Sequence, residues 1–408
     1  MEFKLLESLI LISPWLKPDD YFALMCVNKN FQITLQKFEE FWQQAYLKDF
    51  NKFSSLKPTD ISWEKFYRKR AFPQLWKISN PNLYSINGTP LKINLPRIIQ
   101  IATGKNHVLA LDRLGKVWGF GSNLEKQLGS ATFGSATFSS IEIPVIIPNL
   151  SPIIKIAACE STSLFLSEDN QVWACGLNDR GQCASIRNLQ DSSSRYIIQP
   201  TKSPFFECLK IIDFSIGPSM VLFLDEDGEV YTNREYIRGH YTIYKILLKS
   251  SIREINCQVD CGVLLTNNGR ILIYGYHHGV EDIFQRPVVP KIIRVPIRTI
   301  SNQKIVKAVV NKSDLFLLDD AGRMWKKSVF LLDKKVCKFI YLTGYPEMYD
   351  IFPEEDFVLG FSQNGKIFKI LGATSTSYPF SLLDKINSSE SVLKIVKNEQ
   401  FIIYLAES

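Results

Sequence analysis

The spacing of apolar positions repeats along most of the chain. Each copy opens on an apolar residue, and another follows three positions later, as at Ile98 and Ile101. A second apolar stretch ends just before a polar turn of the type Asp-x-x-Gly, and a third opens with an apolar pair such as Val117-Trp118. Short apolar stretches that flank Gly- or Asn-containing turns predict β-strands joined by hairpins.

Seven copies of this pattern can be aligned. They begin roughly 40 to 60 residues apart, a period typical of propellers and solenoids, at Ile98, Ile153, Ile211, Ile252, Ile305, Met348 and Val392. The seventh copy ends at Ser408 before its third strand, and Leu75-Trp76 supplies a matching strand upstream of the first copy. A ring that both ends close leaves no open sheet edges. We therefore predict a mainly β fold, a seven-bladed β-propeller closed by N- and C-terminal strands.

Two segments that follow the third predicted strand carry a further motif. They read GFGSNLEKQLG at Gly119–Gly129 and ACGLNDRGQCA at Ala174–Ala184. With the strands and turns, they resemble the regulator-of-chromosome-condensation repeat, and the resemblance covers roughly residues 75–408. It implies a propeller whose loops bind proteins. It also implies an alternative function, that of a guanine-nucleotide exchange factor or other binding partner of a Ran-type small GTPase.

Exchange would need a segment that displaces the nucleotide's phosphate-binding elements. The long segments 130–152 and 184–210 offer such a wedge, although their Ser, Thr and Pro content is equally typical of surface loops. His107 is the one family-type turn histidine that the chain retains, and a packing role in the turn is favoured for it.

Before the propeller, apolar residues recur at helical spacing. Leu5 and Leu9 lie four positions apart, and Pro18-Asp19-Asp20 has the proline and acidic residues typical of a helix start. We predict a small N-terminal three-helix domain at residues 1–50, a helical linker at 51–74 and the propeller at 75–408.

The order of residues in the first 50 positions resembles an F-box. The matching positions are Glu7, Leu9, Trp15, Leu16, Lys17, Pro18, Asp20, Leu24, Val27, Lys29, Phe31, Phe41 and Trp42. The chain departs from the F-box pattern at Lys4-Leu5, where that family has Leu-Pro. The resemblance implies the substrate-recognition subunit of a Skp–cullin–F-box type E3 ubiquitin ligase, with the propeller recruiting a protein substrate. The adaptor-binding residues would then be Leu9, Leu16, Pro18, Val27 and Trp42, with Trp42 as the main hot spot.

Composition narrows the remaining classes of function. Hydrophobic residues make up 46% and charged residues 22% of the chain, which is ordinary for a folded soluble protein. The net charge of +7 is mild, and the longest basic run is Arg68-Lys69-Arg70, so no nucleic-acid partner is predicted. No apolar run reaches the length of a membrane span.

The chain has eight cysteines and four histidines, without a C-x-x-C pair or other zinc spacing. We therefore expect no metal or cofactor and a reducing compartment, the cytoplasm or the nucleus. No catalytic constellation is evident, which predicts a non-catalytic receptor or scaffold. His277 and His278 in YGYHHG are weak candidates for binding a substrate, and a solvated turn is the competing interpretation.

Overall fold

The computed structural model describes a large part of the chain. The described residues are 43, 74–79, 91–129, 140–185, 187–188, 195–218, 220–237, 240–258, 261–275, 291–295, 304–311, 314–328, 339–353, 357–362, 367–371, 392–397 and 401–406. The chain divides into two compact units, Met1–Gln74 with Ala406–Ser408, and Leu75–Leu405. Nearly all described residues belong to the second unit, and the description below concerns that unit.

Six sheets are built from antiparallel strands that follow one another along the chain. The first blade contains β3 (Ile98–Thr103), β4 (His107–Asp112), β5 (Val117–Ser122) and β6 (Ser140–Ile146). The second contains β7 (Ile153–Cys159), β8 (Thr162–Ser167), β9 (Val172–Leu177) and β11 (Tyr196–Lys202). The third contains β12 (Ile211–Ile216), β13 (Val221–Asp225), β14 (Val230–Ile237), β15 (His240–Ile246) and, at its edge, β10 (Arg187–Asn188).

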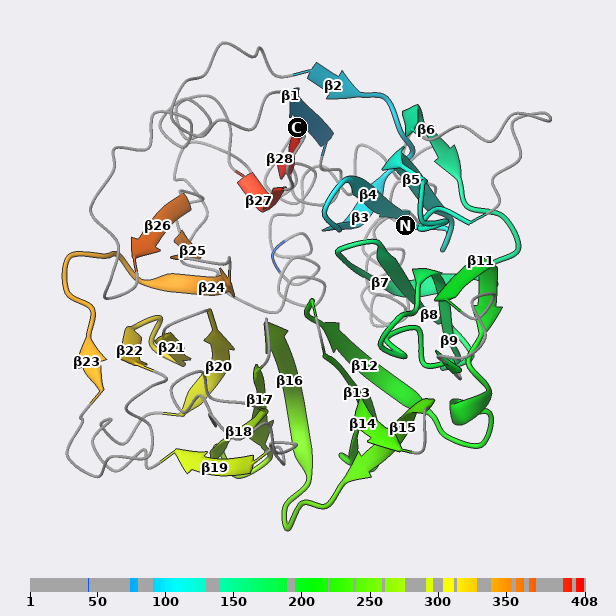
Figure 1. Ribbon diagram of the computed structural model, residues 1–408. Helices are drawn as coiled ribbons and strands as arrows, with labels where there is room; N and C mark the ends of the chain where they lie inside the picture. The colour runs from blue at the N-terminus through cyan, green and yellow to red at the C-terminus, as the bar shows by residue number, and fades with distance from the viewer. Residues whose placement is uncertain are drawn as a thin grey trace, which may run out of the picture. The chain divides into compact units, whose positions relative to one another are not determined.

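The remaining blades follow the same plan. The fourth contains β16 (Ile252–Gln258), β17 (Cys261–Thr266), β18 (Ile271–Gly275) and β19 (Lys291–Val295). The fifth contains β20 (Ile305–Val310), β21 (Asp314–Asp319), β22 (Met324–Ser328) and β23 (Ile340–Tyr341). The sixth contains β24 (Met348–Pro353), β25 (Phe357–Ser362) and β26 (Ile367–Leu371). Figure 1 shows these sheets arranged around a centre, with the first strand of each blade innermost.

The hydrophobic cores lie between successive blades. One cluster joins Leu109 and Val117 of the first blade to Phe165 of the second, and another joins Leu166 of the second blade to Phe223 of the third. Three further clusters join the third blade to the fourth, the fourth to the fifth and the fifth to the sixth. Each repeat therefore buries its apolar face against its neighbour, as the repeat pattern requires.

A glycine in the hairpin turn links each of several blades to the next. Gly115 has a φ of 78°, and its carbonyl accepts the backbone N–H of Ile153 at 2.9 Å. A Cβ at this position would lie 2.9 Å from that nitrogen, so a larger residue would break the contact. The same backbone bond joins Ile252 to Gly228 and Met348 to Gly322, both at 2.8 Å.

The prediction of seven blades with an N-terminal helical domain was wrong. The described residues form a mainly β, six-bladed propeller, because six sheets arise from consecutive strands. Apart from Gln43, which is helical, those residues contain no α-helix; they include the 3-10 helix η4 (Pro204–Phe206) and one further 3-10 residue, Arg195. The helices expected in the first 74 residues rested on apolar spacing, the Pro18-Asp19-Asp20 helix start and the F-box resemblance, and otherwise only Gln74 of that segment, in a strand, is described.

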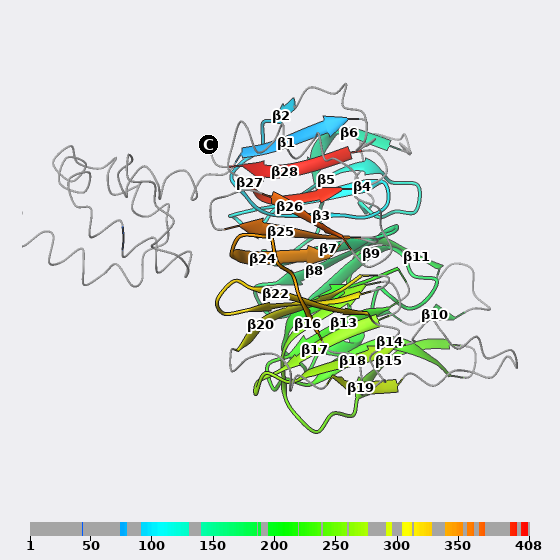
Figure 2. The same cartoon turned by 90° about the vertical axis from the view of Figure 1, so that its left-hand side faces the viewer.

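The two ends of the chain contribute a separate sheet. It has the order β2-β1-β28-β27 and consists of β1 (Gln74–Ser79), β2 (Leu91–Ile93), β27 (Val392–Lys397) and β28 (Phe401–Ala406). Figure 2 shows β28 beside β1. Unlike the six blades, this sheet is not the product of one repeat, since its strands come from opposite ends of the sequence.

Candidate protein-binding face of the propeller

Two surface loops follow the third strands of the first and second blades and share one hydrogen-bonding pattern. In the first loop, 122–129, the side chain of Asn123 donates to the carbonyl of Gly129 at 3.0 Å and accepts the N–H of Leu128 at 2.9 Å. Gln127 closes the tip, because its Oε1 accepts the N–H of Glu125 at 2.9 Å. Asn123 and Gln127 are buried, so they shape the loop and do not face a ligand.

The second loop, 177–184, repeats this arrangement. Asn178 accepts the N–H of Cys183 at 3.0 Å, and Gln182 accepts the N–H of Arg180 at 2.8 Å. At the equivalent point of the two tips the backbone is left-handed, with φ of 64° at Lys126 and 69° at Gly181. The shared Asn-x-x-x-Gln spacing belongs to the repeat motif of the sequence, and the fold shows that its two side chains shape the loop.

Each loop is held in place by the next blade. Ser163 of the second blade donates its hydroxyl to the carbonyl of Gln127 at 2.6 Å, and the thiol of Cys175 donates to the same oxygen at 3.2 Å. In the third blade, Asn233 donates to the carbonyl of Arg180 at 2.8 Å. Loops that are fixed in this way are pre-organised for binding a partner, because little conformational entropy is lost on association.

His107 belongs to the same network and serves packing. Its Nε2 lies 2.9 Å from Ser163 Oγ, and because that hydroxyl donates to Gln127, Nε2 must be the donor. His107 is completely buried, and burial lowers its pKa to about 3. It is therefore neutral at physiological pH and inaccessible to a partner, which agrees with the packing role that the sequence favoured.

The exposed part of the first loop offers both an apolar and a charged group. Leu124 is 68% exposed at the loop tip. Next to it in sequence, Glu125 hydrogen-bonds Tyr196 of β11, an interaction that raises the pKa of the tyrosine. The guanidinium of Arg195 lies 5.3 Å from the centre of the Tyr196 ring. Exposed apolar, aromatic and arginine side chains on a rigid support are typical of protein-binding surfaces.

Polar side chains on the innermost strands link successive blades. Gln100 donates to the carbonyl of Ile156 at 2.8 Å and accepts the N–H of the same residue at 3.0 Å. Ion pairs join Lys155 to Asp213 and Lys307 to Asp350. The side chains that form these links all come from the third position of their strands: Gln100, Lys155, Asp213, Lys307 and Asp350.

The strand geometry explains why the side chain at this third position points toward the adjacent blade. In all six blades the pairing of the first strand with the second shifts register between the first and third positions, as between Ile98 and Gln100. A β-bulge of this kind re-aims the side chains around it. The inner polar residues are therefore already engaged between blades, and we assign them to holding the ring together and not to a ligand.

The residues that the sequence proposed as binding sites lie outside the described residues. This applies to Leu9, Leu16, Pro18, Val27, Trp42, His277 and His278. Within the described ranges, no group of three or more His, Cys, Asp or Glu side chains is placed to hold a metal ion. The six cysteines that the structure describes are free thiols. No described helix is long and apolar enough to cross a membrane.

The wedge segments considered for nucleotide exchange contain strands. Residues 140–146 form β6 at the edge of the first blade, and residues 196–202 form β11 at the edge of the second. Each wedge segment therefore contains residues that pair in a sheet, whereas residues 130–139, 186 and 189–194 lie outside the described part.

Comparison with known proteins supports the repeat assignment. The family model described as "Regulator of chromosome condensation (RCC1) repeat" matches residues 98–127 and 153–182, which contain most of each loop. The chain is 27% identical over 150 residues to the guanine nucleotide exchange factor SRM1 of Saccharomyces cerevisiae, covering 36% of this chain and 30% of SRM1. It is 28% identical over 225 residues to the probable E3 ubiquitin-protein ligase HERC6 of Homo sapiens, covering 51% of this chain and 21% of HERC6.

Solved structures share the fold. The yeast protein Prp20, in a crystal structure with Kap60, has a TM-score of 0.63 at 17% identity and covers 88% of this chain and 95% of its own. A second Prp20 structure, whose title names binding properties to Gsp1p and histones, has a TM-score of 0.61 at 17% identity, covering 82% and 91%. The chain spans less than a third of the length of SRM1 and of HERC6. The chain thus carries regulator-of-chromosome-condensation repeats in a β-propeller.

Proposed function

We propose that this chain is a non-catalytic protein-binding propeller that engages a small GTPase of the Ran type, as an exchange factor or another binding partner. The observation that carries this proposal is the pair of loops, 122–129 and 177–184, which share one bonding pattern and are held by the neighbouring blades. SRM1, which is named an exchange factor, and Prp20, whose structure title names Gsp1p, both support this class of partner.

Exposed residues at opposite ends of β5 give a sharp test. Leu124 precedes the loop tip and is 68% exposed, whereas Leu114 lies in the turn at the other end of β5 and is 73% exposed. We expect Leu124→Asp to weaken GTPase binding about tenfold or more, since a carboxylate would replace an apolar contact. Leu114→Asp adds the same charge on the other face and is expected to leave binding unchanged.

The assay measures release of labelled guanine nucleotide from a purified Ran-type GTPase, and binding of that GTPase by surface plasmon resonance. If the full-length protein accelerates nucleotide release and Leu124→Asp abolishes this effect, the protein is an exchange factor. If it binds the GTPase without accelerating nucleotide release, it is a binding partner of another kind. Absence of binding to the GTPase in any nucleotide state overturns the proposal.

A second function rests on the N-terminal residues. We propose that residues 1–50 bind a Skp-type adaptor of a cullin ubiquitin ligase, through Leu9, Leu16, Pro18, Val27 and Trp42. The motif in the sequence is what favours it, and the propeller would then present a protein substrate to the ligase. Retention of the adaptor by the full-length protein, lost in Trp42→Ala, supports this function, and equal retention by both forms contradicts it. A cytoplasmic or nuclear location would suit either function.

A further inference from the structure

The fourth blade differs from the fifth at the turn between its second and third strands. In the fifth blade, Asp319 Oδ2 accepts hydrogen bonds from Arg323 Nε at 2.9 Å and from Trp325 Nε1 at 3.4 Å. The equivalent residues of the fourth blade are Thr266, Arg270 and Leu272. The arginine is thus kept, while the carboxylate that neutralises it and the large aromatic ring beside it are both replaced.

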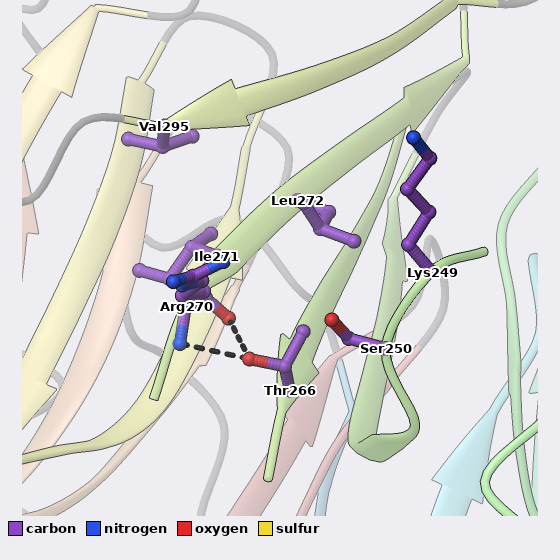
Figure 3. A pocket seen from close by; sticks show the side chains of 7 residues that line it. All are labelled: Lys249, Ser250, Thr266, Arg270, Ile271, Leu272 and Val295. Carbon is purple, nitrogen blue, oxygen red and sulfur yellow. Dashed lines mark hydrogen bonds between the residues drawn. The ribbon is translucent and has the colours of Figure 1, made fainter. Parts of the chain in front are cut away.

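Thr266 closes its turn through backbone atoms. Its hydroxyl oxygen accepts the N–H of Arg270 at 2.8 Å and lies 3.0 Å from the carbonyl oxygen of the same residue, as the dashed lines of Figure 3 show. A hydroxyl carries no charge, so it cannot neutralise the guanidinium as Asp319 does in the fifth blade. The side chain of Arg270 is exposed and has no carboxylate within its own turn.

A cavity of about 370 Å³ opens at this turn (Figure 3). Its lining residues are Lys249, Ser250, Thr266, Arg270, Ile271, Leu272 and Val295. In the fifth blade the indole of Trp325 packs against Tyr341 with ring centroids 5.0 Å apart, and the equivalent residue of the fourth blade, Leu272, is smaller.

The lining combines two positive charges with an apolar surface. Lys249 comes from the segment before β16 and Arg270 from the turn before β18, so two separate parts of the chain supply the cations. The hydroxyl of Ser250 adds a donor, and Leu272 and Val295 contribute aliphatic groups. Among the described residues, those that line the cavity include no acidic side chain. Arginine and lysine together with a hydroxyl are the usual donors to phosphate oxygens.

We propose that this cavity binds a phosphate monoester with an apolar body. The phosphate group is held by Lys249 and Arg270, and the apolar body rests on Leu272 and Val295. The turn precedes β18, whereas the candidate protein-binding loops follow the third strands of their blades. The cavity therefore lies at the opposite end of the strands from those loops, and the proposal stands independently of GTPase binding.

Titration of the full-length protein with small probes tests the proposal. We expect phenyl phosphate to bind at millimolar or lower concentration, inorganic phosphate about tenfold more weakly and phenol not measurably, by isothermal titration calorimetry. A phosphotyrosine peptide that binds more tightly than phenyl phosphate identifies a protein source of the ester, and equal binding identifies a small molecule. Both results support a phosphate monoester site, and failure of phenyl phosphate to bind at about 10 mM overturns it.

Variants taken from the fifth blade make the test specific. Thr266→Asp restores a carboxylate beside Arg270, and Leu272→Trp fills the cavity, so each is expected to reduce affinity about tenfold or more. Arg270→Gln changes an exposed side chain and keeps the proposal testable if either of those variants fails to fold. Lys304→Ala removes an exposed positive charge outside the cavity and is the control. Unchanged binding in Arg270→Gln, or an equal loss in Lys304→Ala, contradicts the proposal.

Discussion

Trp118 donates its indole N–H to Asp112 across the first hairpin turn, with 3.0 Å between Nε1 and Oδ2. The other carboxylate oxygen of Asp112 accepts the N–H groups of Leu114 and Lys116 at 2.9 and 3.0 Å. The same relationship joins Asp225 to the hydroxyl of Tyr231 at 2.9 Å in the third blade. The Asp-x-x-Gly turn and the aromatic residue six positions after its Asp therefore form one structural unit.

The second blade lacks half of this unit, which leads to a first prediction. Ser167 stands at the aspartate position, and the buried Nε1 of Trp173 has no hydrogen-bond partner. Ser167→Asp supplies an acceptor and is expected to stabilise the protein by about 1 kcal/mol, the usual worth of a satisfied hydrogen bond. The substitution gives up the hydrogen bond from the Ser167 hydroxyl to Asp169, two positions later. Two aspartates at this spacing are compatible with the turn, because the third blade has Asp225 and Asp227, with the backbone N–H of Asp227 donating to Asp225. The measurement is the free energy of unfolding in urea.

A matched control separates this effect from a general benefit of aspartate in the turn. Ser362 stands at the same position of the sixth blade, where the aromatic residue is Phe368, which has no polar hydrogen to donate. Ser362 is completely buried, so Ser362→Asp is expected to destabilise the protein. Stabilisation by both substitutions, or by neither, would refute the pairing of turn and aromatic residue.

The strands of the propeller were predictable because their signals are local. Alternating apolar residues, the turn glycine and the apolar pair lie within about 25 residues of each other in each copy, and the structure places the first three strands of the six blades accordingly. The outermost strands were not predicted. β23 has only two residues and both are exposed, so its sequence carries no burial pattern. Strands of this kind form because they pair with an existing sheet, and their own sequence does not predict them.

The candidate sites were less predictable, because they depend on departures from the repeat. Thr266 and Leu272 align with the turn and apolar-pair positions, and in the sequence they served only to mark another copy. The fifth blade shows what they change: there Asp319 accepts a hydrogen bond from Arg323, whereas Thr266 offers Arg270 no carboxylate. The packing role of His107 was predictable from the sequence, because the other copies lack a histidine at this position.

The tip of the first loop gives a second prediction, from its comparison with the second loop. Lys126 has a φ of 64°, a left-handed conformation that costs a non-glycine residue about 1 kcal/mol. Gly181 occupies the equivalent position of the second loop at 69°. Lys126→Gly is expected to be neutral or stabilising by about 0.5 kcal/mol, since relief of strain exceeds the entropy that glycine adds to the unfolded chain.

The reverse substitution is the control for that prediction. Gly181→Lys introduces strain where the chain now has none, so it is expected to lower the melting temperature. If Lys126→Gly destabilises the protein by more than about 1 kcal/mol, the lysine side chain makes a contact that outweighs its backbone conformation.

The buried histidine leads to a third prediction, on acid stability. The pKa of His107 falls from 6.5 to about 3 on folding, so the unfolded chain binds a proton that the folded chain does not. Its contribution to stability is therefore complete above pH 6.5 and is lost as the pH falls toward 3, by up to about 1.4 kcal/mol per pH unit. His107→Gln is expected to remove this slope. The difference in unfolding free energy between wild type and variant, measured from pH 4 to 8, should depend on pH, and a constant difference would contradict the assignment.

Glu254 on β16, the innermost strand of the fourth blade, leads to a fourth prediction, in which stability falls as the pH rises. Burial raises its pKa above the ordinary value of 4.5, although Lys307 and Arg253 lower it, while Asp350 and Asp213 raise it further. The folded chain therefore holds this proton more tightly than the unfolded chain, and stability is lost as the pH rises from 4.5 through the folded-state pKa. Glu254→Gln cannot ionise, so it should be more stable than wild type at pH 7 and lose that advantage below pH 4.5.

Urea unfolding at several pH values checks this expectation, with Glu226→Gln as the control. Glu226 is an exposed carboxylate that pairs with Lys210 at 3.1 Å, and its replacement should produce no comparable gain at pH 7. A Glu254→Gln variant that is less stable than wild type at pH 7 would show that the ionised carboxylate contributes more through Lys307 and Arg253 than burial removes.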